Sequence, residues 1–270
     1  MRTGIRASSV VFLAALFLGR GAFAQDAAQA NALREQALAI IMKDCTVPAY
    51  LKAIPLLEQA HKLDPKNDLV LGTLSDYYWE LADLLPKNTG PEKKVRLEWF
   101  NKGIEAGKEC LELNPKNPDG IFFYATNLAS AGEMVSIVKS IWMFPALKSG
   151  MDKVDRVDPD YGQGSVDRFW AEIASRVPNF VCKAVGMAKE DGIADLIKDT
   201  KKWPDRFDNF TYLARLQWDL KRKDDALKNL EYVLTHDPEA DPTVIAGNYL
   251  ELDFARKMWK QYTGKEFSDR

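Results

Sequence analysis

The sequence predicts an all-α protein that is built as a solenoid of helical hairpins. Apolar residues recur at helical spacing along most of the chain, and no segment alternates apolar and polar residues as a half-buried strand would. Residues 207–240 contain two such helices, separated by a short charged break. A proline follows the second helix of this stretch, and similar prolines follow three earlier helices. The four prolines are Pro65, Pro115, Pro159 and Pro238.

The clearest unit is the segment 207–240. Small Ala214 and Ala226 allow the two helices to approach closely, and Pro238 ends the second helix because it lacks a backbone N–H. With Phe207 as position 1, the packing residues fall at positions 4, 7, 8, 11, 20, 24, 27 and 32, which resembles the tetratricopeptide repeat. These residues are Phe210, Leu213, Ala214, Gln217, Ala226, Leu230, Val233 and Pro238.

The first hairpin repeats this register near the start of the chain. Helical spacing covers residues 27–44 and 50–63, on either side of a turn at 46–48. The intervals between the four prolines are unequal, and each is longer than the segment 207–240, so the repeats are divergent and carry insertions. Because one hairpin cannot bury its own apolar face, we expect about five of them to stack.

The middle of the chain is predicted to supply the other helices of the stack. They are expected at 68–85, 94–113, 121–131, 146–157, 165–177 and 191–202. Residues 134–144 lie between two of these helices and are unusually apolar for a connector. A last amphipathic helix at 243–262 has a polar outer face, so we expect it to cap the solenoid.

Residues 1–24 have the pattern of a secretory signal peptide. Arg2 and Arg6 precede an apolar run at 10–18, and Ala22-Phe23-Ala24 precedes a predicted cleavage after Ala24. A short membrane anchor is the alternative, although the run is shorter than the roughly 20 residues that span a bilayer. The mature domain would be residues 25–270, in the periplasm or secreted. Cleavage removes three arginines and changes the formal net charge from −2 to −5, which argues against a nucleic-acid partner.

No catalytic residue, metal site or cofactor is predicted. His61 and His236 are far apart in the repeat order, so they do not suggest a triad or a metal cluster. Gly162 and Gly164 precede a helix with no strand before them, which favours a turn over a phosphate-binding loop. Buried thiols are favoured for the three cysteines, with one disulfide plus an odd thiol as the alternative. The cysteines are Cys45, Cys110 and Cys182.

Several segments are similar to the T-component (TatT-like) family of TRAP transporters, periplasmic helical-repeat proteins that accompany a substrate-binding protein. The matching segments are 53–60, 99–111, DPDYGQGSVDRFWA at 158–171, and Val177-Pro178. The third is the most specific. The resemblance implies a helical-repeat fold and an association with solute uptake. It carries over no binding residues, and the lipidated cysteine with which family members often begin is absent here.

Two functions are consistent with these features. The first is a non-enzymatic periplasmic protein that partners the substrate-binding protein of a TRAP-type transporter and passes on a small apolar or organic-acid ligand. The second is a general cell-envelope scaffold for protein–protein interaction. Self-association to a homo-oligomer is compatible with both.

Two candidate sites follow from the repeat geometry. In such solenoids the first helix of each hairpin is called helix A. Its positions 2, 5, 9 and 12 line the inner face, where ligands usually bind. The predicted groove residues are Asp76, Trp79, Phe122, Arg215 and Trp218, and the alternative is that the aromatic side chains belong to the core. The predicted partner-contact residues are Trp142, Met143 and Phe144, and the alternative is a buried helix in an inserted hairpin.

Overall fold

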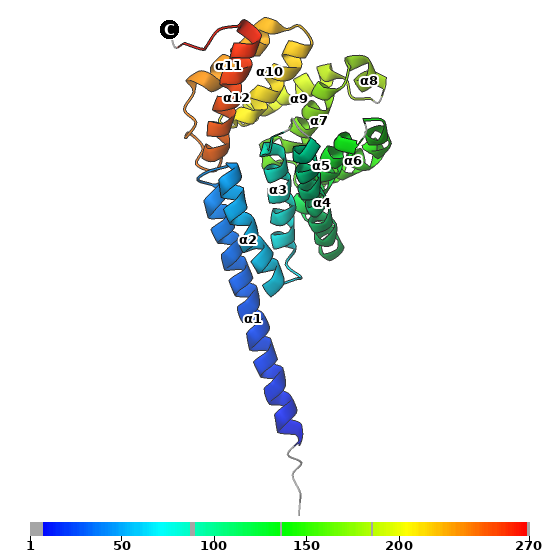
Figure 1. Ribbon diagram of the computed structural model, residues 1–270, viewed down its shortest axis with the longest axis vertical. Coiled ribbons are helices and arrows are strands. Elements are labelled where there is room, and N and C mark those ends of the chain that lie inside the picture. The colour runs from blue at the N-terminus through cyan, green and yellow to red at the C-terminus, as the bar shows by residue number, and fades with distance from the viewer. Residues whose placement is uncertain (1–7, 87–89, 136, 185, 269–270) are drawn as a thin grey trace, which may run out of the picture. The chain divides into compact units, whose positions relative to one another are not determined.

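The structure is a computed structural model that describes residues 8–86, 90–135, 137–184 and 186–268 (Figure 1). Every regular element within these ranges is helical, which confirms the predicted all-α class. None of the described helices is long and apolar enough to cross a membrane. The elements are α1 (Ser8–Ile41), α2 (Val47–Leu63), α3 (Asp68–Leu84), α4 (Gly90–Leu113), α5 (Pro118–Val135), α6 (Ile137–Val157), η1 (Tyr161–Gln163), α7 (Ser165–Arg176), α8 (Asn179–Ala184), α9 (Lys189–Lys202), α10 (Phe207–Asp219), α11 (Lys223–Thr235) and α12 (Ile245–Thr263).

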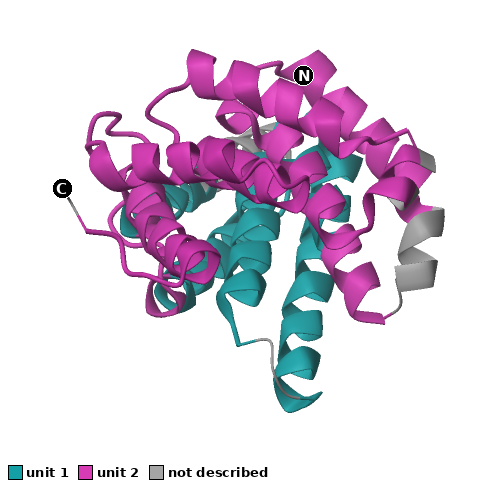
Figure 2. Ribbon diagram, turned by 90° about the horizontal axis from the view of Figure 1, so that it is seen from above, with its two compact units in different colours: residues 1–40, 50–127 teal, residues 41–49, 128–270 magenta. Residues whose placement is uncertain are grey.

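The chain divides into two compact units, which Figure 2 shows in different colours. Unit 1 contains residues 1–40 and 50–127, and unit 2 contains residues 41–49 and 128–270. Each unit has its own set of buried apolar side chains. The two units are therefore described separately.

Four helices end at the same local turn. In each turn an Asp or Asn precedes a proline, and its Oδ1 accepts a hydrogen bond of 2.9–3.4 Å from the backbone N–H two residues on. The helix stops there because proline cannot donate to the helix and disfavours the helical conformation of the residue before it. The helix ends predicted from the four prolines are confirmed. The turn residues are Asp64, Asn114, Asp158 and Asp237, after α2, α4, α6 and α11.

In unit 1, helices α3, α4 and α5 meet at a buried polar contact. Asn127 on α5 donates to the backbone carbonyl of Ser75 on α3 at 2.9 Å, and the Ser75 hydroxyl donates to the carbonyl of Gly103 on α4 at 2.8 Å. A Cβ atom on Gly103 would lie 2.2 Å from Asn127 Oδ1. The close approach of α4 to α5 therefore requires glycine at this position.

After α6, unit 2 continues as two successive hairpins and a last helix. Helices α7 and α9 bury one apolar cluster against α10, and α10 and α11 bury a second one against α12. The second cluster contains most of the packing positions predicted for residues 207–240, so that hairpin is confirmed. Its buried members are Phe207, Phe210, Ala214, Ala226, Leu230, Val233, Leu252 and Ala255.

Helix α12, predicted as residues 243–262, is fastened to the preceding hairpin by Asn248. This side chain is 1% exposed. Its Oδ1 accepts from the backbone N–H of Phe207 at 3.1 Å, and its Nδ2 donates to the carbonyls of Asp205 and Pro238 at 2.8 and 3.1 Å. One residue therefore joins α12 to the start of α10 and to the turn after α11.

Several helices begin or end away from the sequence-based expectation, and three differences matter most. Residues 134–144 are not a connector, because α5 continues to Val135 and α6 already begins at Ile137. Their apolar density is that of helices, and Pro145 lies inside α6. The short helix α8 was not predicted, and α1 extends through the predicted signal region from Ser8.

Among the residues that the structure describes, no disulfide joins Cys45, Cys110 and Cys182. Cys110 and Cys182 are fully buried, as the favoured interpretation expected, and Cys45 is partly exposed. Burial raises the pKa of the Cys110 thiol to about 12, which makes it inert as a nucleophile at neutral pH.

Candidate binding face of helices α7, α10 and α12

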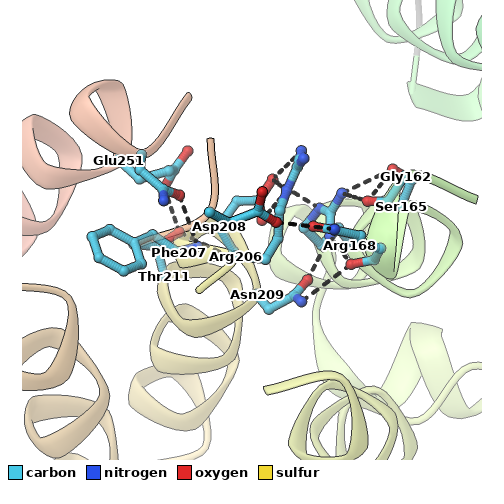
Figure 3. A network of polar contacts seen from close by, with 12 residues as sticks. Gly162, Ser165, Arg168, Arg206, Phe207, Asp208, Asn209, Thr211 and Glu251 are labelled. Carbon is cyan, nitrogen blue, oxygen red and sulfur yellow. Dashed lines mark hydrogen bonds and ion pairs between the residues drawn. The ribbon is translucent and has the colours of Figure 1, made fainter. Parts of the chain in front are cut away.

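One face of α10 carries the inner positions of the repeat, and each of its side chains contacts the helix before or after it. We call this surface, with the partners that α7 and α12 contribute, the α10 face. Figure 3 shows its polar part. Its members are Arg168 and Glu172 on α7, Asp208, Thr211, Arg215 and Trp218 on α10, and Glu251 and Tyr262 on α12.

The innermost member is Arg168, which is only 7% exposed. Its Nη atoms donate to the carbonyls of Gly162 and Gln163 at 2.7 and 2.8 Å, to the Ser165 hydroxyl at 2.8 Å, and to Asn209 Oδ1. Its Nε lies 3.2 Å from Asp208 Oδ2. All five N–H groups of the guanidinium therefore have a partner (Figure 3).

Arg168 stabilises a turn that few sequences could form. Residues 162–164 have φ angles of +53°, +54° and +96°, a left-handed conformation that favours glycine. Gln163 is not a glycine, and its carbonyl is held by both Arg168 and Asn209 Nδ2, the latter at 3.1 Å. The turn expected from Gly162 and Gly164 is confirmed. It also explains why residues 158–171 form a distinctive segment: they encode this turn and the arginine that stabilises it.

Two carboxyl groups on the face have opposite pKa shifts. Burial opposes ionisation of Asp208, but Arg168 and Arg206 outweigh it and hold the pKa of this carboxyl below its usual value. Burial and the Asp208 charge raise the pKa of Glu251 to about 7. The Thr211 hydroxyl donates to Glu251 at 2.5 Å and only partly offsets this rise. Glu251 therefore changes its charge near neutral pH.

The remaining members of the face are only partly exposed, and Trp218 and Tyr262 pack against the apolar cluster of α10, α11 and α12. Arg215 pairs with Glu172 and lies over the Tyr212 ring, 5.0 Å from its centroid, and its side chain is 36% exposed. One turn further, the Trp218 ring stacks on Tyr262 with centroids 3.9 Å apart and planes at 3°. The Arg215 cation on α10 thus lies one turn from an aromatic pair that α10 and α12 share.

The groove residues predicted in unit 1 lie on α3 and α5. Asp76 and Trp79 are partly exposed, whereas Phe122 is 8% exposed and its neighbour Phe123 faces Trp79 with centroids 6.2 Å apart. Burial, Glu80 and Asp119 raise the pKa of Asp76 well above its usual range. Of the five predicted residues, Asp76, Trp79 and Phe122 belong to unit 1, and Arg215 and Trp218 belong to unit 2.

The predicted partner-contact segment is only partly described. The side chain of Trp142 lies outside the described residues. Met143 and Phe144 are partly buried, and the Phe144 ring packs against Trp170 on α7 at 5.3 Å. This aromatic contact lies within unit 2 and fastens α6 to α7.

Sequence reasoning placed Arg215 and Trp218 on the inner face but missed the side chains that α7 and α12 contribute. Glu172, Glu251 and Tyr262 lie about 40 residues away along the chain, and only the packing of α7 and α12 beside α10 brings them near. Within the described ranges, no group of three or more His, Cys, Asp and Glu side chains could hold a metal ion.

The fold is similar to that of a solved helical-repeat protein, and two further solved structures match less well. The thermophilic tetratricopeptide-repeat (TPR) protein TTC0263 of Thermus thermophilus matches with a TM-score of 0.55 and 17% identity over 83% of this chain and 98% of that one. YrrB, a TPR protein with an unusual peptide-binding site, matches with a TM-score of 0.37 and 12% identity over 74% of this chain and 84% of that one. MamA protein matches with a TM-score of 0.38 and 13% identity over 88% of this chain and 98% of that one.

The comparisons of sequence found less similarity than the comparison of structures. No protein-family profile and no curated protein sequence matches it. At 17% identity the Thermus protein shows the fold alone. The chain has a TPR-like helical-repeat fold.

Proposed function

We propose that this chain is a non-enzymatic binding protein that holds a protein partner on the α10 face. The observation that carries the proposal is the partly exposed group of Arg215, Trp218 and Tyr262. Arg, Trp and Tyr are the residue types that contribute most to protein–protein binding energy. Arg215 and Trp218 lie at positions 9 and 12 of α10, which are among the positions that helical-repeat proteins use for ligands, and Tyr262 stacks on Trp218 from α12.

The accessible part of the face rests on a rigid base. Arg168 and Asn248 fix α7, α10 and α12 through hydrogen bonds that are fully used within the chain. By contrast, the ion pair between Arg215 and Glu172 is partly exposed, and such pairs are worth only about 0–1 kcal/mol. A carboxylate or carbonyl of a partner can therefore replace Glu172 at little cost, while the base stays unchanged.

For the identity of the partner, the resemblance to the TRAP T-component family favours the substrate-binding protein of a transporter, met in the periplasm after cleavage at Ala24. The fold alone explains the most specific part of that resemblance, residues 158–171, as the turn held by Arg168. A general cell-envelope scaffold is therefore the second candidate. The two differ in which protein is bound, and the proposed site is the same.

The test compares three tagged proteins expressed in the native host and purified with their bound partners. They are the wild type, the double variant R215A/W218A, and Tyr249→Ala as control. Tyr249 is an aromatic residue of α12 outside the α10 face, and it is 49% exposed. A hot-spot truncation costs about 2 kcal/mol or more, so recovery of the partner should fall at least about tenfold in R215A/W218A and stay unchanged in Tyr249→Ala.

Mass spectrometry of the recovered proteins separates the two candidates. A transporter's substrate-binding protein would support the finer assignment, and other envelope proteins would support the scaffold. Equal recovery by wild type and R215A/W218A, with unchanged circular dichroism, would overturn the proposed face. Native mass spectrometry of the same samples reports a retained small ligand or a homo-oligomer.

A further inference from the structure

Two aromatic rings of unit 1 lie beside a lysine ammonium group. Tyr78 on α3 stacks on Trp99 on α4, with ring centroids 5.6 Å apart and planes at 28°. The Lys102 ammonium lies 4.2 Å from the centroid of Trp99 and 5.5 Å from that of Tyr78. Because these three distances are similar, the cation is within reach of both rings at once. The ring pair therefore attracts one positive group with two aromatic faces.

A carboxylate from a third helix completes the arrangement. Glu58 on α2 accepts a hydrogen bond of 2.8 Å from the Tyr78 hydroxyl, and its Oε1 lies 4.0 Å from the Lys102 ammonium. The hydrogen bond fixes the Tyr78 ring, which is only 7% exposed. Aromatic rings with a carboxylate beside them can recognise an ammonium group by its charge and its shape. We call the group of Glu58, Tyr78 and Trp99 the ammonium site.

The lysine that now occupies the ammonium site is held loosely. The side chain of Lys102 is 50% exposed and that of Glu58 is 40% exposed. Ion pairs and cation–π contacts that are open to water in this way are weak. Glu105 is exposed and lies three residues further along α4, on the same side of the helix. Lys102 can therefore turn toward Glu105 when another cation takes its place.

We propose that the ammonium site binds a methylated ammonium group, and that Lys102 is an internal occupant which this ligand displaces. A primary ammonium such as that of lysine is strongly hydrated, so it gains little by leaving water for the rings. A quaternary ammonium is weakly hydrated and gains more from two aromatic faces. The ligand is either a free choline-like cation or a trimethylated lysine of a protein. This inference concerns unit 1 and is independent of partner binding at the α10 face.

Choline and its uncharged isostere 3,3-dimethylbutanol test the site in the intact chain. The two probes have nearly the same shape, so the difference between them measures the effect of the positive charge. Ligand-detected NMR gives the affinity, and the indole N–H signal of Trp99 gives the location. Choline should bind saturably and shift the Trp99 signal, and the alcohol should bind about fivefold more weakly or less.

Removing the occupant and removing the site should have opposite effects. Lys102→Ala should tighten choline binding about threefold, since the competing ammonium is gone. Trp99→Leu and Glu58→Gln should each weaken it about threefold or more. The matched control is Trp203→Leu, because Trp203 also lies under a lysine, with 4.4 Å between the Lys202 ammonium and the ring centroid, but belongs to unit 2. This control should bind choline as the wild type does.

Equal affinity for choline and the alcohol would overturn the proposal, because the charge would then contribute nothing. The same conclusion would follow from choline binding that Trp99→Leu leaves unchanged, or from no saturable binding by either the wild type or Lys102→Ala. Should Trp99→Leu fail to fold, as judged by circular dichroism, Glu58→Gln decides in its place.

A short peptide with one trimethyllysine, compared with the same peptide carrying ordinary lysine, identifies the source of the ligand. Tighter binding of the methylated peptide than of choline would indicate a protein ligand. Weaker binding of that peptide than of choline would indicate a free cation. Binding of the ordinary lysine peptide as tight as that of the methylated one would contradict the preference for a methylated ammonium group.

Discussion

The same repeat positions carry opposite charges in the two units. Counted from the start of its helix, position 9 is Asp76 on α3 in unit 1 and Arg215 on α10 in unit 2, and position 12 is a tryptophan in both. The charged groups that shift the Asp76 pKa are both acids, Glu80 and Asp119. In unit 2, by contrast, Arg215 pairs with Glu172 and Asp208 pairs with Arg168.

This difference shows that the repeat determines the positions of these side chains but not their charges. Both tryptophans face an aromatic ring of the next helix A, Trp79 toward Phe123 and Trp218 toward Tyr262. The spacing thus fixes where the side chains lie, while their charges are free to differ. Unit 2 compensates its buried charges with partners, and unit 1 holds an acid that gains a proton instead.

The largest expected effect comes from removing Arg168, the partner of the buried Asp208 carboxylate in unit 2. Arg168→Met should lower the free energy of unfolding by about 4 kcal/mol, because Asp208 then remains buried without its partner and the carbonyls of the turn lose their donors. Chemical denaturation measures this. Arg256→Met removes an exposed arginine that pairs with Asp253, and it should cost less than about 1 kcal/mol. A loss of the same size in both variants would contradict the account.

Two aspartate substitutions should have opposite signs in the two units. Asp208 has a lowered pKa, so its contribution to stability is present at neutral pH and disappears as the pH falls through that pKa; Asp208→Asn should cost about 3 kcal/mol at pH 7. Asp76 has a raised pKa, so the wild type loses stability as the pH rises from about 4. Asp76→Asn should therefore raise the melting temperature at pH 8 more than at pH 4.

Melting curves of both variants at pH 4 and 8 test this contrast. Two shifts of the same sign at pH 8 would show that the charge environments of the units are alike. The matched control is Asp224→Asn, which should change neither curve by more than the error, since Asp224 is exposed.

A smaller effect tests the polar contact in the core of unit 1. Gly103→Ala would bring a methyl group into Asn127, so we expect a loss of about 2 kcal/mol in the free energy of unfolding. Gly247→Ala in α12 has nothing within 4 Å of the added carbon and should be neutral or stabilising by about 0.5 kcal/mol. Equal stabilities of the two variants in urea would argue against tight packing between α4 and α5.

The smallest expected effect on stability is that of Arg215→Ala. Because its ion pair with Glu172 is partly exposed, its loss should change the free energy of unfolding by less than about 1 kcal/mol. Partner binding should nevertheless fall, since the cation is on the accessible part of the α10 face. A variant that lost binding only together with its melting transition would indicate a structural role for Arg215.

The parts of the fold that depend on local sequence were predictable. The four turns in which an Asp or Asn precedes a proline, here called Asx-Pro turns, follow from residues that are close in the sequence. The same is true of the hairpin at 207–240. The start of α6 was missed because periodicity alone cannot separate an apolar connector from a buried helix. Phe122 was assigned to the groove and is buried, whereas its neighbour Phe123 faces Trp79. The repeat position alone does not determine which of two adjacent aromatic side chains is buried.

For the candidate site, the sequence indicated the local contacts but not the long-range ones. Gly162 and Gly164 indicated a turn, and three of the partners of Arg168 lie within six residues of it. The role of Arg168 was still hidden, since Asp208 and Asn209 approach it only after α10 packs beside α7. Long-range pairs of this kind have no signature in a single sequence.

The Asx-Pro turns have a consequence for how such a protein can change its length. Each turn ends its helix with its own atoms, so the stop does not depend on the length of the segment that follows. The unequal intervals between the four prolines are therefore compatible with the same ending. Segments inserted or deleted between these turns leave the ends intact, which makes the turns natural points for recombining hairpins, in evolution as in engineering.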